Sequence, residues 1–186
     1  MIIETERLRL RNWEKRDLLP FLRMNQNPQV LEHLPGPVAN LEEAQAIIDR
    51  LQAHIKEHGF GPWATELKET GEFIGWVGLY IPRFEAHFTP CVEIGWRLDA
   101  PYWGKGYATE AAKAVLEAAF TKFGLNEIVS FTVPANIRSI RVMEKIGLKR
   151  DLQGDFEHPK LPEGHRLRKH VLYRISGEEF LPERNL

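Results

Sequence analysis

The stretch "VEIGWRLDAPYWGKGYATEAAKAVLEAAFTKFG", from Val92 to Gly124, changes from the pattern of a strand to that of a helix. In residues 92–98 apolar side chains alternate with the others, which is typical of a strand. From residue 108 to residue 123 apolar side chains recur at helical spacing and a glycine follows, so a long helix is predicted. The glycine turn between them, residues 103–108, carries two glycines and a lysine, and the interpretation of the chain depends on what this turn does.

The rest of the sequence predicts more strands and helices around this strand–turn–helix unit. Helices are expected over residues 14–26, where Pro20 should disturb the helix, over 40–59 with Asn40 as the cap, and over 136–147. Further strands are expected over residues 5–13, 61–68, 71–81, 127–133, 148–156 and 167–175. In the first of them, Leu8 and Leu10 are expected on one side and Arg7, Arg9 and Arg11 on the other. This order predicts an α/β (α+β) fold of three layers, with a mixed central β-sheet flanked by helices. Because no repeat or linker is visible, residues 1–186 are expected to form a single domain.

Composition and charge exclude several classes of partner. The formal net charge of −1 offers no general attraction for nucleic acid or anionic lipid, so neither is expected to bind. No apolar run reaches the roughly 18 residues that span a bilayer, and the first residues lack the apolar segment of a signal peptide. The single cysteine, Cys91, excludes an internal disulfide and suits a reducing compartment. A cytoplasmic protein is predicted, and its oligomeric state is left open, a dimer included.

The glycine turn has the chemistry of an anion site. A helix start exposes unpaired N–H groups and a partial positive charge, and Gly104 and Gly106 lack the side chains that would keep a phosphate away. Lys105 adds a cation, although an exposed lysine on a plain strand-to-helix joint is the alternative. The turn does not match a P-loop, because Lys105 precedes the last glycine. It also does not match a dinucleotide fingerprint, which would need Gly or Ala where Thr109 stands.

Four segments together resemble the GNAT superfamily of acetyl-CoA-dependent N-acetyltransferases. They are "IETERLRLR" near the start, "VEIGWRL", "YWGKGYATEA" and "NIRSIRVMEKIGL", and the last two in combination are quite specific. The chain is most similar to the RimJ/RimL branch, which acetylates the N-terminal alanine of ribosomal proteins. The resemblance implies the GNAT fold, whose central sheet has a splayed gap for the acyl-CoA.

The resemblance also assigns residues to the acyl donor. The family's pyrophosphate loop, Gln/Arg-x-x-Gly-x-Gly/Ala, falls on Trp103-Gly104-Lys105-Gly106-Tyr107-Ala108, with Trp103 replacing the polar first residue. The N–H groups from Gly104 through Thr109 would then hold the coenzyme A diphosphate. The backbone of Trp96 and Leu98 would pair with the pantetheine arm, and Asn136 would bond a pantetheine amide unless it serves only as a helix cap.

The catalytic assignments follow from what the reaction needs, a base for the amine and an acid for the departing thiolate. Glu93 is the candidate base, with a purely structural glutamate as the alternative, and Arg97 would hold it ionised or pair with it. Many family members carry a tyrosine acid seven residues after the asparagine, but Met143 stands there and its thioether has no proton to donate. Ser139 is the substitute candidate, and a local cap bond is its alternative.

The predicted function is acetyl transfer from acetyl-CoA to a primary amine, either a protein N-terminus or a small molecule, by direct attack in a ternary complex. The alternative is an acyl-CoA-binding sensor without catalysis, which Met143 favours. No metal is expected, because the histidines at positions 158, 165 and 170 are widely spaced and separated by prolines.

Overall fold

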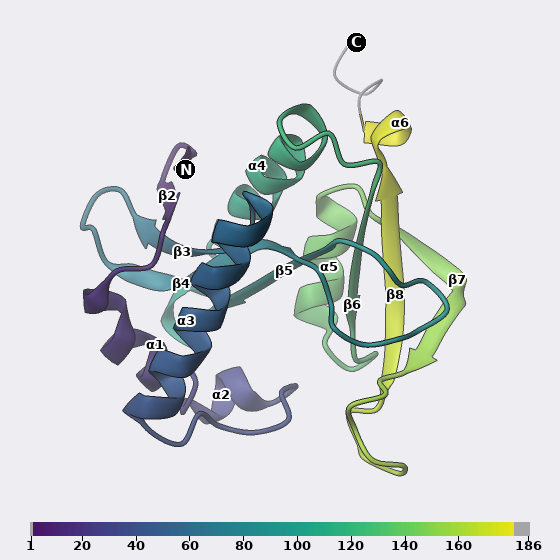
Figure 1. Ribbon diagram of the computed structural model, residues 1–186, viewed down its shortest axis with the longest axis horizontal. Helices are drawn as coiled ribbons and strands as arrows, with labels where there is room; N and C mark the ends of the chain where they lie inside the picture. Colours follow the sequence, from purple (N-terminus) through teal and green to yellow (C-terminus); the bar gives the residue numbers. More distant parts are fainter. Residues whose placement is uncertain (1, 181–186) are drawn as a thin grey trace. The chain divides into compact units, whose positions relative to one another are not determined.

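A computed structural model describes residues 2–180 of the chain (Figure 1). These residues form two compact units, the first from residues 2–80 and 95–115 and the second from residues 81–94 and 116–180. Strand β5 (Glu93–Leu98) and helix α4 (Tyr107–Thr121) contribute residues to both units. The single domain over residues 1–186 stays a prediction.

The first unit contains a run of antiparallel strands. Their order is that of the sequence, β1 (Ile3–Glu4), β2 (Leu8–Arg11), β3 (Pro62–Leu67) and β4 (Phe73–Tyr80). In the register, Leu10 lies opposite Thr65 and Ala64 lies opposite Trp76. The end of β5 follows β4, because the N–H of Asp99 donates to the Ile74 carbonyl at 2.9 Å. The alternation predicted for the first strand is confirmed at Leu8 and Leu10, which are both fully buried.

The helices of the first unit are the 3₁₀ turn η1 (Lys15–Asp17), α1 (Leu18–Met24), α2 (Pro28–Leu31), α3 (Leu41–His58) and the 3₁₀ turn η2 (Ala100–Tyr102). Of these helices, α3 has the bounds that the sequence predicts, while α2 and η2 were not predicted. Helix α3 starts at Asn40, whose Oδ1 accepts from the Glu43 N–H at 2.9 Å, and ends at Gly59 in the left-handed region. The helix predicted over residues 14–26 is divided into η1 and α1, and Pro20 lies in the first turn of α1, where its missing N–H is not needed.

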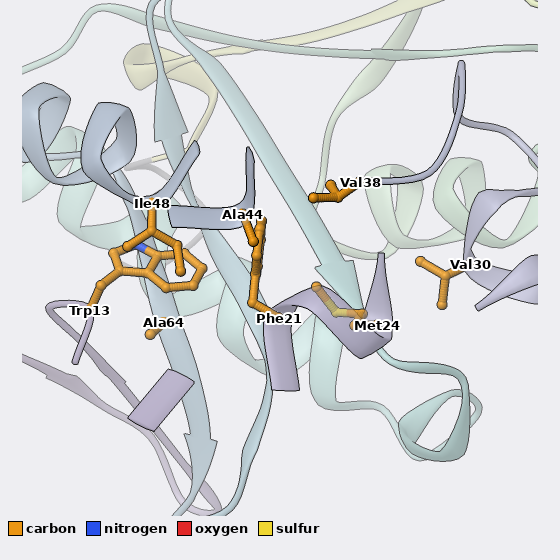
Figure 2. Close-up of a cluster of buried hydrophobic side chains, with 8 residues drawn as sticks. All are labelled: Trp13, Phe21, Met24, Val30, Val38, Ala44, Ile48 and Ala64. Atoms are coloured by element: carbon orange, nitrogen blue, oxygen red, sulfur yellow. The ribbon is translucent and has the colours of Figure 1, made fainter. Parts of the chain in front are cut away.

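An apolar cluster fills the first unit where α1 and α3 pack against β3 and β4 (Figure 2). Its buried members are Trp13, Phe21, Met24, Val30, Val38, Ala44, Ile48 and Ala64. Figure 2 shows Ile48 of α3 beside the Trp13 ring, and the Trp13 and Phe21 rings meet edge to face with centroids 5.4 Å apart. Trp103 of the glycine turn packs against this same cluster, so the turn is supported by the core.

A buried charged cluster in the first unit was not predicted from the sequence. Arg11 was expected on the polar side of its strand, yet it is only 5% exposed. Its guanidinium donates to both carboxylate oxygens of Asp17, at 2.7 and 2.8 Å, and to Glu66 at 2.7 Å. Both carboxylates are buried as well, so Arg11 provides the charge that allows them to be inside.

The second unit contains both parallel and antiparallel strand pairs. The start of β5 pairs in parallel with β6 (Glu127–Thr132) at Glu93 and Val129, and β8 (Lys169–Ser176) lies antiparallel to both β6 and β7 (Lys149–Glu157). Helix α5 (Ile137–Lys145) lies beside β6 in Figure 1, and the short α6 (Gly177–Phe180) follows β8. The strands and helices predicted for this region are therefore confirmed.

An aromatic cluster joins the strands and the 81–92 segment of the second unit. Phe84 and Phe88 contact Phe131 and Phe156, with ring centroids 4.8 to 6.1 Å apart. The rings meet one another at steep or offset angles, as in a packed core. Among the helices of residues 2–180, none combines the length and the apolar character that a membrane span requires.

Candidate functional site

The glycine turn has an open, left-handed backbone at the start of α4. Gly104 and Gly106 have φ of +75° and +84°, a region that side-chain-bearing residues rarely adopt. The Glu110 N–H donates to the Gly106 carbonyl at 3.0 Å, so the helical bonding begins at Gly106. A Cβ built at Gly104 would have no neighbour within 4 Å, whereas one built at Gly106 would lie 3.4 Å from Arg7 Nη2, so the backbone is open at Gly104. Bare amides at a helix start fit an anionic group such as a diphosphate.

Trp103 attaches the glycine turn to the end of β5. Its indole Nε1 donates to the Leu98 carbonyl at 2.8 Å, and its own N–H donates to the Ala100 carbonyl at 3.1 Å. The Leu98 carbonyl therefore already has one partner, and only its second lone pair would serve a pantetheine amide. The tryptophan in the position of the family's polar residue thus has a structural role.

Arg7 and Glu110 contact the turn from its other side, and sequence reasoning did not assign either of them. Arg7 Nη1 donates to the Lys105 carbonyl at 3.0 Å, and Arg7 Nε donates to Glu110 Oε2 at 2.7 Å. Glu110 Oε1 accepts from the Arg7 N–H at 2.9 Å and from the Thr5 hydroxyl at 2.6 Å. The only sequence signal was the "TERLRLR" segment, which indicated a strand and a family resemblance but no partner.

Lys105 is exposed. This exposure is compatible with both interpretations of Lys105, a contact to the phosphate and an ordinary surface lysine. Its Nζ lies 5.7 Å from the centre of the Tyr102 ring, within the range of a cation–π contact. The assignment of Lys105 to the donor stays a prediction.

Glu93, in the second unit, is partly buried, and this changes its acid–base behaviour. The loss of solvent raises the pKa of the Glu93 carboxyl to about 8. Desolvation is the one cause of this shift, so the role expected of Arg97, holding Glu93 ionised or pairing with it, stays a prediction. Arg97 belongs to the first unit, where it donates to Asn25 Oδ1 and lies over the Trp76 ring, 5.7 Å from its centre. Burial lowers the pKa of Arg97 to about 10.

Cys91 lies two residues before Glu93 and is partly buried. Burial, with smaller contributions from Glu93 and Glu127, raises the pKa of its thiol to about 12. A thiol with such a pKa is a poor nucleophile at neutral pH, so Cys91 does not resemble a catalytic cysteine.

The start of α5 contains the other predicted site residues of the second unit. Asn136 Oδ1 accepts from the Ser139 N–H at 3.3 Å, so Asn136 is the N-cap, and its Nδ2 donates to Thr132 Oγ1 at 3.1 Å. The Ser139 side chain is partly buried. Met143 is 1% exposed and lies inside the fold, so this position is a core residue of α5.

The predicted site residues thus fall into two groups, one in each unit. The first unit brings together the following donor-binding candidates: Trp96, Leu98, Trp103, Gly104, Lys105, Gly106, Tyr107, Ala108 and Thr109. The second unit contains Glu93, Asn136 and Ser139. Across residues 2–180, no group of three or more His, Cys, Asp and Glu side chains has the arrangement of a metal site.

Comparison with known proteins identifies the family. The model of the acetyltransferase (GNAT) domain matches residues 7–149, which include both the glycine turn and α5. This chain belongs to the GNAT acetyltransferase family. It is 32% identical over 180 residues to the uncharacterized N-acetyltransferase YnaD of Bacillus subtilis, an alignment that covers 97% of this chain and 99% of the relative. Family membership supports acetyl transfer with acetyl-CoA as the donor.

Solved structures confirm the GNAT fold with its mixed sheet flanked by helices. A GNAT-family acetyltransferase from Bacillus anthracis superposes with a TM-score of 0.79 at 29% identity, over 96% of this chain and 100% of the other. RimJ of Mycobacterium smegmatis, solved with CoA-disulfide, superposes with a TM-score of 0.73 at 24% identity, over 92% of this chain and 83% of the other. The second likeness shows the fold alone, so the RimJ/RimL branch stays a prediction.

Proposed function

We propose that this GNAT protein transfers the acetyl group of acetyl-CoA to a primary amine by direct attack in a ternary complex. The observation that carries the proposal is the open glycine turn, with left-handed Gly104 and Gly106 at the start of α4. Such a turn holds a diphosphate through its amides and the positive end of the helix. Holding donor and acceptor together supplies much of the rate, because it replaces a bimolecular encounter with a local one.

Glu93 is the base in this proposal. An attacking ammonium must lose a proton, and a carboxylate with a pKa near 8 is far better matched to that task than an ordinary one. The raised pKa also means that Glu93 is mostly protonated at neutral pH, so turnover should rise with pH through about 8. The positions of Glu93 and of the turn in this sequence agree with the family pattern, which supports assigning both to one reaction.

The acid step has weaker support. Met143 has no proton to donate and is buried, so the tyrosine found in many relatives has no counterpart there. Ser139, in the first turn of α5, is the remaining candidate for a hydrogen bond to the departing sulfur.

The acceptor class in this proposal is a primary amine, either a protein N-terminus, as in the RimJ/RimL branch, or a small molecule. Both kinds of acceptor fit the chemistry proposed for Glu93.

The test is the release of free thiol from acetyl-CoA across a panel of amines and N-terminal peptides, with mass spectrometry of the products. We expect turnover with at least one acceptor, and we expect Glu93→Gln to lower kcat/KM by about 100-fold above pH 8, within the range that acid–base catalysis contributes. Coenzyme A affinity should stay near that of the wild type in this variant. The matched control is Glu6→Gln, an exposed glutamate near the chain start.

Two results would count against the proposal. Tight coenzyme A binding without thiol release on a broad panel would favour the sensor. A Glu93→Gln variant with unchanged kcat/KM at every pH would remove Glu93 from the reaction.

A further inference from the structure

Arg7 bonds the N-terminal strand region of the first unit to the glycine turn and the start of α4, and the Thr5 hydroxyl adds a bond to Glu110. Arg7 contacts three parts of the turn and its helix, namely the Lys105 carbonyl, the Glu110 carboxylate and the face of the Tyr107 ring, whose centre is 4.5 Å from the guanidinium carbon. These contacts join residues about a hundred positions apart in the sequence. None of them is needed to form the helix, because the helical bond from Glu110 to Gly106 is made by the backbone.

The bond to Lys105 fixes the direction of an amide in the proposed diphosphate site. In a trans peptide the C=O and the following N–H point in opposite directions. Arg7 Nη1 lies 3.0 Å from the Lys105 oxygen, so it holds that carbonyl toward itself. The Gly106 N–H must then point away from Arg7, and a glycine peptide would otherwise rotate freely.

The bond to Glu110 removes an obstacle to anion binding. Burial alone would raise the pKa of Glu110, but hydrogen bonds from Thr5 and Arg7 outweigh it and lower the pKa, so the side chain is an anion at neutral pH. An unpaired carboxylate in the first turn of α4 would compete for the positive helix end and repel a diphosphate. Arg7 neutralises this charge with two bonds of 2.7 Å and holds the carboxylate toward the N-terminal segment.

We infer that Arg7 is a positioning residue for the diphosphate of the acyl donor, acting through the Lys105–Gly106 peptide and through Glu110. The inference rests on the proposed function and adds to it a residue outside the family's phosphate loop. Arg7 would affect how tightly the donor binds and would leave the chemical step unchanged.

The test compares Arg7→Gln and Arg7→Lys with Arg9→Gln. Arg9 is the matched control, because it lies on the same chain segment with a similar side-chain exposure, 38% against 43%, and pairs with Glu4 and Glu66 instead of the turn. Calorimetric titration with coenzyme A should show a Kd about 10-fold higher for Arg7→Gln, because the amide of the diphosphate site is no longer held and the Glu110 charge is no longer neutralised. Arg7→Lys should raise the Kd for coenzyme A less than Arg7→Gln does. The Kd of Arg9→Gln should stay within about twofold of the wild-type value, as expected for an exposed pair.

A truncated donor separates positioning from general damage. S-acetyl-pantetheine lacks the diphosphate, so its KM should be the same in the wild type and Arg7→Gln, while the KM for acetyl-CoA rises and kcat at saturation is kept. In the E110Q background, Arg7→Gln should cost clearly less than in the wild type, because no carboxylate is left unpaired. Thermal melting verifies that each variant is folded. If Arg7→Gln is not folded, the comparison is made with the milder variant Arg7→Lys.

The possible failures are distinguishable. If the wild type does not bind coenzyme A, the proposed function fails, and the first titration reveals it before any variant is compared. If the wild type binds but Arg7→Gln matches Arg9→Gln, or loses both donors equally, the role of Arg7 is refuted while the proposed function stands.

Discussion

At the scale of single residues, Glu93 links burial to pH. Its pKa is about 8 in the folded protein, against about 4.3 for a glutamate in an unfolded chain. Between these values the folded state keeps a proton that the unfolded state has lost, so the contribution of Glu93 to the free energy of unfolding falls as pH rises through this window. Glutamine has the same shape and never ionises. Glu93→Gln should therefore be more stable than the wild type by a few kcal/mol at pH 9 and by much less at pH 5.

Urea unfolding at pH 5, 7 and 9 measures this difference without any assay of activity. Glu6→Gln, at an exposed site, serves again as the control. A stability gain of the same size at all three pH values would contradict a buried, proton-binding Glu93.

Substitution of Arg11 should lower the free energy of unfolding, because Arg11 pairs with two buried carboxylates. Arg11→Met leaves Asp17 inside without its cation and removes one partner of Glu66, both of which are at most 1% exposed. Breaking a buried pair from one side costs about 3–5 kcal/mol. We expect a loss of this size in the free energy of unfolding by urea, against less than about 1 kcal/mol for Arg9→Met at the partly exposed pair beside it. Equal losses in the two variants would show that burial of the Arg11 network is unimportant.

At the scale of elements, α3 depends on the residue that caps its start. Asn40 Oδ1 satisfies the Glu43 N–H, and Glu43 Oε2 accepts in return from the Ala39 N–H at 2.7 Å. Asn40→Ala removes the first bond and should lower the free energy of unfolding by about 1 kcal/mol. Asn40→Asp keeps an acceptor and should be nearly neutral, and the two are compared by thermal melting. An alanine variant as stable as the aspartate variant would show that the cap does not contribute.

Elements with local signals could be predicted from the sequence, and those with distant partners could not. Three predictions needed only a few neighbouring residues, and all three are confirmed: the strand before the glycine turn, the Asn40 cap and the helix end at Gly59. Helix α2 spans four residues, too few to show a period. Arg11 looked like a surface residue because its partner Glu66 lies on another strand.

In the candidate site, too, features with a local sequence signal could be predicted, and features that depend on distant residues could not. The glycine turn is a contiguous motif, so its place before α4 could be predicted, while the contact of Arg7 with Glu110 joins two segments that share no pattern. The pKa of Glu93 also required the structure, because it depends on how much solvent the fold removes.

At the scale of the whole molecule, donor binding should appear as global stability. A ligand that binds only the folded state at 100 times its Kd adds about 2.7 kcal/mol. For a chain of 186 residues this should raise Tm by about 5–10 °C. Coenzyme A should produce the shift in a thermal melt and pantetheine at the same concentration should not, because it lacks the diphosphate. Equal shifts with both would show that the glycine turn contributes nothing to affinity.

The protonated state of Cys91 has a practical consequence for enzymology. It is the only cysteine of the chain, and its thiol, with a pKa of about 12, is overwhelmingly uncharged at the pH of an ordinary assay. Dyes that report liberated coenzyme A react with thiolates, so the polypeptide itself should contribute almost no colour. The release of coenzyme A can therefore be followed continuously at a high concentration of a slow enzyme, without replacing Cys91.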